Sequence, residues 1–145
     1  MTKNIPSLLL ADDDADDRGI FKDALDELPD TGKLETVNDG AELMQYLHDT
    51  PDDLPDVLFL DLNMPRKTGS ECLMEIKAHD KLKKLIVIIF STTFDVNTIS
   101  ALYDQGANFY MSKPASFSEL KNKIKNALSR LSSSGQTDRD NFVLD

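Results

Sequence analysis

The stretch that decides the fold reads Asp56-Val57-Leu58-Phe59-Leu60-Asp61-Leu62-Asn63-Met64-Pro65. Its apolar run is too short for a helix of normal length, and it ends abruptly at the carboxylate of Asp61. Short apolar runs bounded by turn residues are typical of strands buried on both faces of a parallel sheet. Pro65 cannot continue a strand ladder and Gly69 follows it, so we expect Asp61 where the strand becomes a loop. Ligands bind at the carboxyl ends of parallel strands, which makes Asp61 a candidate functional residue.

The size and composition of the chain indicate one globular domain. It has 145 residues, of which 40% are hydrophobic and 29% charged, a balance typical of a soluble folded protein. The net charge of −10 argues against nucleic acids and anionic membrane surfaces as partners, because both attract Lys and Arg. Cys72 is the single cysteine, so no intrachain disulfide can form. Since we find neither a signal peptide nor an apolar stretch long enough to span a bilayer, we expect a cytoplasmic protein.

Short apolar runs alternate with helix-like segments along the chain. We expect strands at residues 5–10, 34–37, 57–60, 85–90 and 108–112. Apolar residues at helical spacing predict the intervening helices, with Asp39, Ser70 and Ser116 as candidate N-caps. The alternation predicts an α/β fold, a doubly wound sheet of five parallel strands with helices on both faces.

The alternating pattern ends before the chain does. Residues 1–131 form the expected domain, and residues 132–145, which are serine-rich and then polar, are expected to be a flexible C-terminal tail. Phe142-Val143-Leu144 near its end is expected to be frayed, with a docking segment as the alternative.

Polar residues follow four of the expected strands. Asp12 and Asp13 come after the first, Asp61 after the third, Ser91 after the fourth and Lys113 after the fifth. Crowded carboxylates favour a hard divalent cation, and Mg²⁺ takes one or two carboxylates together with phosphate oxygens. A lysine ammonium and a serine hydroxyl suit a phosphoryl group. The set therefore indicates a phosphoryl-transfer site in which Asp61 is the nucleophile.

Four motifs together resemble a known family. They are Leu-Leu-Leu-Ala-Asp12-Asp13, Asp61-Leu-Asn63-Met64-Pro65 with Gly69, Ile-Ile-Phe-Ser91, and Tyr110-Met-Ser-Lys113-Pro114. In this order and at these strand ends, the chain resembles the receiver domain of two-component response regulators over about residues 5 to 131. It resembles the stand-alone receivers, of which the chemotaxis regulator and the cyanobacterial phytochrome partners are examples. The resemblance implies a flavodoxin-like sheet with strand order 2-1-3-4-5.

The resemblance also implies a role for each acidic residue. Asp61 would accept a phosphoryl group from a sensor histidine kinase or a phosphotransfer protein. Asp13 and Asp61 would bind Mg²⁺ directly, Asp12 would act partly through water, and Asn63 would contribute its backbone carbonyl. The protein would then be a single-domain response regulator of a phosphorelay, a switch rather than a turnover enzyme.

The remaining residues of the motifs would form the switch. Lys113 would pair with the phosphate, Ser91 would move toward a phosphate oxygen, and Tyr110 would repack inward. Phosphorylation would then change a partner-binding surface at about residues 95–131, which could bind an unknown downstream protein or form a homodimer. Thr92 stands where the family often has a smaller residue, so its bulk is expected to affect the lifetime of the phosphorylated state.

Other interpretations of the same residues remain open. The acidic run 12–17 fits a negatively charged helix start, and Asp61, Lys113 and Tyr110 fit a turn residue, a surface lysine and a core aromatic. Asp12-x-Asp14-x-Asp16 also mimics a Ca²⁺ loop, but the required Gly and Glu are replaced by Asp17 and Asp23. The alternative function is a Mg²⁺-dependent phosphatase with an Asp nucleophile, because Asp12-x-Asp14 resembles its motif. A third hypothesis is a receiver-like interaction protein that works without phosphorylation.

Overall fold

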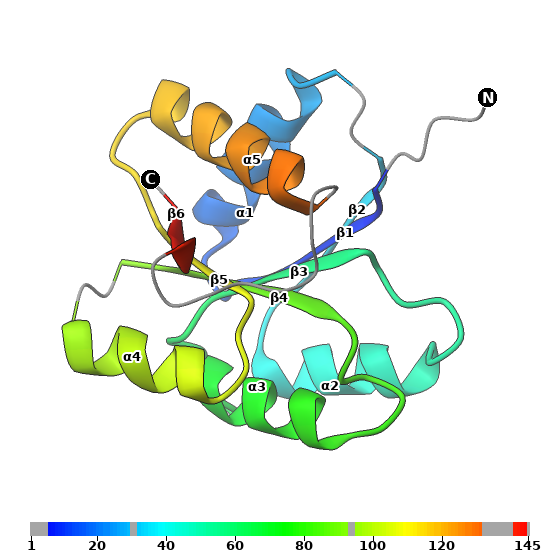
Figure 1. Ribbon diagram of the computed structural model, residues 1–145. Helices are drawn as coiled ribbons and strands as arrows, with labels where there is room; N and C mark the ends of the chain where they lie inside the picture. Colours follow the sequence, from blue (N-terminus) through cyan, green and yellow to red (C-terminus); the bar gives the residue numbers. More distant parts are fainter. Residues whose placement is uncertain (1–5, 30–31, 93–94, 132–140, 145) are drawn as a thin grey trace.

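The structure is a computed structural model of the chain that describes residues 6–29, 32–92, 95–131 and 141–144. Strands and helices alternate from the first strand to the last helix (Figure 1). The elements are β1 (Leu8–Ala11), α1 (Ala15–Asp26), β2 (Leu34–Val37), α2 (Gly40–Asp49), β3 (Val57–Leu60), α3 (Gly69–Ala78), β4 (Ile86–Ser91), α4 (Val96–Asp104), β5 (Phe109–Ser112), α5 (Phe117–Leu131) and β6 (Val143–Leu144). Among these residues, no helix combines the length and the apolar character needed to cross a membrane.

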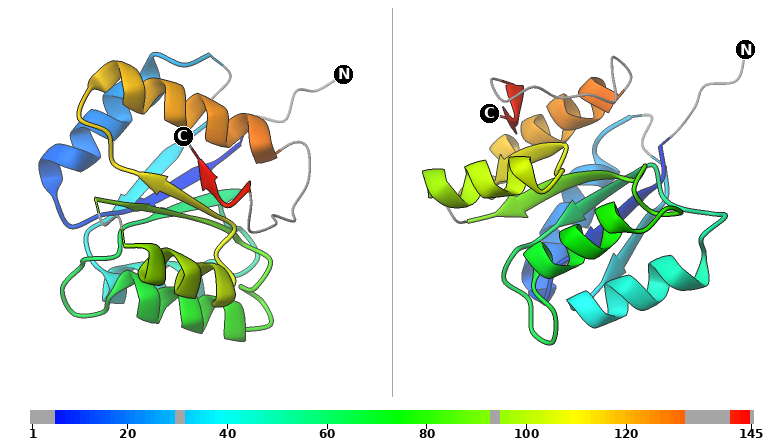
Figure 2. Two further views of the ribbon diagram at one scale, coloured as in Figure 1. Left: turned by 60° about the vertical axis from the view of Figure 1, so that its left-hand side comes forward. Right: turned by 60° about the horizontal axis from the view of Figure 1, so that its bottom comes forward.

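The sheet is parallel throughout and has helices on both faces. Its strand order is β2-β1-β3-β4-β5-β6. Helices α1 and α5 cover one face, and α2, α3 and α4 cover the other (Figures 1 and 2). The predicted doubly wound α/β fold and the order of its first five strands are therefore confirmed.

Two hydrophobic cores hold these layers together. Successive residues of a strand point to opposite faces, so Leu9 and Ala11 of β1 enter the core under α2, α3 and α4. Leu8 and Leu10 enter the core under α1 and α5. All four residues of β1 are buried, which is why the strand reads as an unbroken apolar run.

The sheet has a sixth strand where we expected five. Val143 and Leu144 pair in parallel with Tyr110 and Met111 of β5, and the side chains of Phe142 and Leu144 are buried. Residues 132–140 of the predicted tail lie outside the described residues, but its end packs on the edge of the sheet. A strand of two residues is too short to show a periodic pattern, so the sequence could not indicate it.

Two of the three predicted N-caps are confirmed. The side chain of Asp39 accepts a hydrogen bond from the N–H of Glu42 at the start of α2, and Ser116 Oγ accepts one from the N–H of Glu119 in α5. The prediction of Ser70 as the cap of α3 is wrong. Thr68 caps this helix because Glu71 completes a reciprocal capping box with it.

Candidate functional site

The site lies at the carboxyl edge of the sheet, where backbone hydrogen bonds fix its residues. Asp12 and Asp61 directly follow the adjacent strands β1 and β3. The N–H of Asp12 donates to the carbonyl of Val37, and the N–H of Asp61 donates to the carbonyl of Ala11. On the other side, the N–H of Lys113 donates to the carbonyl of Ser91 at 2.9 Å. The strand ends thus bring together side chains that are up to 101 residues apart in the sequence.

The loop after Asp61 turns tightly, and Gly69 permits it. A Cβ atom on Gly69 would lie 2.2 Å from the backbone carbonyl oxygen of Asp61. The N–H of Gly69 donates to the carbonyl of Leu62 at 3.0 Å, which closes the loop onto its own beginning. No side chain fits this approach, so Gly69 helps to hold the Asp61 backbone in place.

Three carboxylates converge at this edge as predicted. One oxygen of each of Asp12, Asp13 and Asp61 lies within 4.8 Å of the others. Asp12 and Asp61 are buried, whereas Asp13 is exposed. Three hard oxygen donors at this spacing, with one side open, fit a divalent cation of the Mg²⁺ type that keeps several waters.

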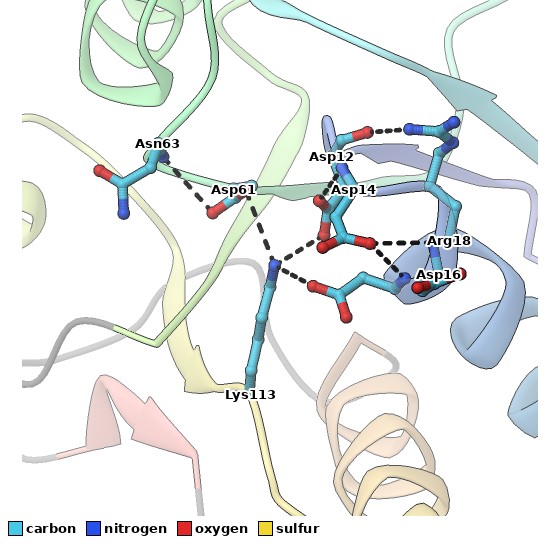
Figure 3. Close-up of polar contacts among 8 residues, drawn as sticks. Asp12, Asp14, Asp16, Arg18, Asp61, Asn63 and Lys113 are labelled. Carbon is cyan, nitrogen blue, oxygen red and sulfur yellow. Dashed lines mark hydrogen bonds and ion pairs between the residues drawn. The ribbon is translucent and has the colours of Figure 1, made fainter.

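Lys113 reaches into the acidic cluster from the end of β5 (Figure 3). Its Nζ atom lies 2.8 Å from Asp12 Oδ2, 2.9 Å from Asp17 Oδ2 and 3.6 Å from Asp61 Oδ2. Burial lowers the pKa of Lys113, but its hydrogen bonds to Asp12 and Asp17 and the charge of Asp61 outweigh this effect. The net shift of the pKa is upward, so the lysine stays charged.

Asp17 is a partner of Lys113 that we did not expect from the sequence. We interpreted Asp17 as part of a negatively charged helix start, and it does lie in the first turn of α1. The same position turns its carboxylate toward Lys113. No pattern in the sequence indicates this contact, because it depends on how the first turn of α1 is oriented toward the end of β5.

Asp14 and Asp16 stay outside the cluster. The carboxylate of Asp14 caps α1 by accepting hydrogen bonds from the N–H groups of Asp16 and Asp17. Asp16 is exposed. The N–H of Asp14 donates to Asp12 Oδ1 at 3.0 Å, and Arg18 donates to the backbone carbonyl of Asp12 (Figure 3). These contacts hold the loop after β1 firmly around the buried Asp12.

The surroundings of Asp61 raise the pKa of its carboxyl group. Burial raises the pKa of this carboxyl from 3.8 to about 6, and the charges of Asp12 and Asp13 add to the rise. The charge of Lys113 and the N–H of Asn63, which donates to Asp61 Oδ1 at 3.4 Å, only partly offset it. A buried carboxylate with a raised pKa and an incomplete set of partners is typical of a functional residue.

Ser91 lies at the same carboxyl edge of the sheet as the cluster, and Tyr110 neighbours Ser91 from the adjacent strand β5. Ser91 ends β4 and is fully buried, and Tyr110 lies in the middle of β5 with its side chain in the core. Burial raises the pKa of Tyr110, and the neighbouring Ser91 side chain partly offsets the rise. Tyr110 already occupies the inward position that we expected it to take on phosphorylation.

The fold and this site define a class: a doubly wound α/β protein with a cluster of acidic side chains and a lysine at the carboxyl edge of its sheet. Residues 8–125 match the model of the response regulator receiver domain. The match covers most of the chain, and the chain belongs to this family. It is accordingly a receiver-domain response regulator of two-component signalling.

Several known response regulators are similar to this chain over most of its length. The chemotaxis protein CheY of Pseudomonas aeruginosa is 32% identical, covering 86% of this chain and 97% of the relative. The response regulator Rcp1 of Synechocystis is 28% identical, covering 78% and 80%. The crystal structure of the phosphorylated cyanobacterial phytochrome response regulator RcpA superposes with a TM-score of 0.81 and 32% identity, covering 90% of this chain and 96% of that one. The Mn²⁺-bound form of Rcp1 gives 0.79 with 25% identity, covering 92% and 99%.

Proposed function

We propose that Asp61 accepts a phosphoryl group from a histidine kinase or a phosphotransfer protein, in a reaction that needs Mg²⁺. The observation that carries the proposal is the position of Asp61, between two acidic neighbours and 3.6 Å from the ammonium of Lys113. A phosphorylated and a Mn²⁺-bound structure of similar regulators support it. The protein would be a signalling switch rather than a turnover enzyme.

The chain offers a suitable place for the cation. Asp12, Asp13 and Asp61 would hold it with their carboxylates, and the backbone carbonyl of Asn63 would complete the protein's share of the ligands. When bound, Mg²⁺ neutralises the charge that accumulates on the transferring phosphoryl group and on the acidic cluster. The ammonium of Lys113 pairs with the buried carboxylate of Asp12, so part of the negative charge of the site is compensated before a cation binds.

The transfer itself follows from the chemistry of a carboxylate nucleophile. An oxygen of the ionised Asp61 attacks the phosphorus, and an O–P bond forms. The P–N bond to the donor histidine breaks, and its electron pair returns to the imidazole nitrogen. Lys113 is placed to turn from Asp61 to an oxygen of the bound phosphoryl group, because its Nζ atom lies within 4 Å of three carboxylates and keeps Asp12 and Asp17 as anchors.

The phosphoryl group would then act on the switch residues. It adds roughly −1.5 to −2 charge units. The Ser91 hydroxyl is a donor that a phosphoryl oxygen can recruit, and the Tyr110 side chain adjoins Ser91. A shift from about 1% to 99% active requires roughly 5.5 kcal/mol, so several new contacts must favour one state. The surface of α4, β5 and α5 would transmit the change to a downstream protein or to a second copy.

The phosphatase alternative lacks support at a specific residue. Such an enzyme needs its second acidic residue free to act on the leaving group, and this would be Asp14. The Asp14 carboxylate instead caps α1 through two N–H groups. The contacts of Asp14 therefore favour the phosphoacceptor role of Asp61.

Labelling with a small phosphodonor such as acetyl phosphate tests the proposal. We expect one base-labile phosphoryl group per chain in the presence of Mg²⁺ and none in Asp61→Asn. The matched control is Asp16→Asn, which removes an exposed carboxylate of the same acidic run and should label like the wild type. Undiminished labelling of Asp61→Asn, or steady hydrolysis of small phosphate esters, would refute the proposal.

A further inference from the structure

The strand β6 covers the edge of β5. Parallel sheets of this kind leave an edge strand with unpaired N–H and carbonyl groups, which is a template for another strand. Here residues 143–144 of the chain's own C-terminal segment lie beside β5 and pair with it (Figure 2). The carbonyl of Phe142 accepts a hydrogen bond of 2.9 Å from the N–H of Tyr110.

Two apolar side chains anchor this segment on opposite faces of the sheet. The Phe142 ring meets the Tyr103 ring of α4 edge-on at 5.3 Å and joins the core under α2, α3 and α4. Leu144 joins the other core, together with Ile124 of α5. Both anchors are 2% exposed, whereas Val143 between them is 37% exposed. The edge of β5 thus binds three consecutive residues in extended conformation. The first and third are apolar and buried, and the side chain of the second is partly exposed to solvent.

The hold on the segment is weak enough to be exchanged. The ladder spans only two residue pairs, and two buried side chains must offset the ordering of residues 141–144. These opposing terms are of similar size, so local opening costs much less than global unfolding. A segment tethered to the same chain nevertheless has a high effective concentration at the edge, and this keeps it in place against weak competitors.

We propose that the edge of β5, flanked by α4 and α5, is a strand-accepting docking surface. Its partner is an extended peptide segment with large apolar residues at alternate positions, which adds to the sheet by strand pairing. Residues 141–144 occupy the surface in cis and exclude such a partner until they leave. The proposal goes beyond the phosphoacceptor role of Asp61 and does not depend on it.

The experiment uses the chain's own segment as the probe. A fluorescein-labelled peptide of residues 139–145 is titrated with the full-length protein, and binding is followed by fluorescence anisotropy. In Phe142→Ala/Leu144→Ala the internal competitor is weakened, so this variant should bind the peptide at least tenfold more tightly than the wild type. Val143→Ala is the matched control, because it truncates the exposed side chain of the same strand and should behave like the wild type.

Hydrogen exchange at Tyr110 separates loss of the occupant from loss of the fold. The Tyr110 amide should exchange faster in the double variant than in the wild type, while the amides of β1 and β3 stay protected. Saturation with the peptide should restore the protection of Tyr110. Equal affinity of all three proteins for the peptide, no binding to the double variant, or unchanged exchange at Tyr110 would overturn the proposal. A stable dimer that exchanges residues 141–144 between copies would overturn the assignment of a cis occupant.

Discussion

The loops after β1 and β3 each contain a buried carboxylate, but the two carboxylates differ in how closely their hydrogen-bond and ion-pair partners approach them. Asp12 has Lys113 Nζ at 2.8 Å and the N–H of Asp14 at 3.0 Å. Asp61 has the same ammonium only at 3.6 Å and a long N–H contact of 3.4 Å. The contacts of the first loop fix the Asp12 carboxylate in place, whereas the Asp61 carboxylate in the second loop has only long contacts to its partners. The difference explains why two adjacent acidic residues can take different roles, one as anchor and one as reactive group.

The removal of Lys113 should have the largest effect on stability, because it takes away the cation that both carboxylates share. Lys113→Ala leaves the buried Asp12 without its cation, and breaking a buried pair in this way costs about 3–5 kcal/mol. We expect this loss in the free energy of unfolding from urea titrations, with part of it regained when Mg²⁺ is added. The control is Lys121→Ala, which removes the exposed pair with Glu27 and should cost less than about 1 kcal/mol. A Lys113→Ala protein as stable as the control would contradict the anchoring role of Asp12.

The dependence of stability on pH should identify Asp61 as the under-satisfied carboxylate. Burial raises the pKa of Asp61 from 3.8 to about 6, so the folded state holds this proton more tightly than the unfolded state. The resulting stabilisation is present at low pH and is lost as the pH rises through about 6, and in the absence of divalent cations it amounts to about 3 kcal/mol. Asp61→Asn should therefore be more stable than the wild type near pH 7, by up to that amount.

This gain should shrink as the pH is lowered to about 4, where the wild-type carboxyl is protonated. Urea unfolding in EDTA over this range measures it, and Asp16→Asn supplies the baseline for a lost surface charge. If the gain were the same at every pH, or larger in acid, the ionisation of Asp61 would not be the cause.

Substitution of Gly69 should disturb the loop after β3 and leave the loop after β1 intact. Gly69→Ala forces a Cβ against the carbonyl of Asp61, so the loop must shift. We expect a stability loss of about 1–3 kcal/mol and slower labelling by acetyl phosphate. Gly19→Ala is the matched control: nothing lies within 4 Å of its Cβ position, and alanine should stabilise α1 by up to about 1 kcal/mol. Normal labelling of Gly69→Ala would show that the loop tolerates the shift.

Removal of Asp17 should have the smallest effect. Asp17 is partly exposed and is a second partner of Lys113, so Asp17→Asn leaves the pair with Asp12 intact. The change in the free energy of unfolding should be below about 1 kcal/mol. A loss as large as that of Lys113→Ala would mean that Asp17, rather than Asp12, holds the lysine.

The sequence predicted much of the fold and the centre of the site because both rest on strand ends. Asp12, Asp13, Asp61 and Lys113 each stand just beyond the end of an expected strand. Parallel pairing brings such ends together without any detail of the side chains. The order of the strands along the sequence was therefore enough to predict that Asp61 and Lys113 lie at the same edge of the sheet. Their roles in phosphoryl transfer rest on the proposal above.

The features that the sequence missed depend on contacts too local or too short for a pattern. Asp17 faces Lys113 only because of the rotation of the first turn of α1. Thr68 outcompetes Ser70 as a cap because Glu71 is placed to return its hydrogen bond. The strand at Val143–Leu144 has two residues, and its place is set by the edge of β5 rather than by its own periodicity.

The most direct test of the central claim locates the phosphoryl group on the chain. The protein is labelled with acetyl phosphate and Mg²⁺, the acyl phosphate is reduced with borohydride, and the peptides are sequenced by mass spectrometry. We predict that the reduced residue, homoserine, appears at position 61 alone, and that chelation of the metal abolishes it. Homoserine at position 12 or 13, or labelling that survives chelation, would contradict the account.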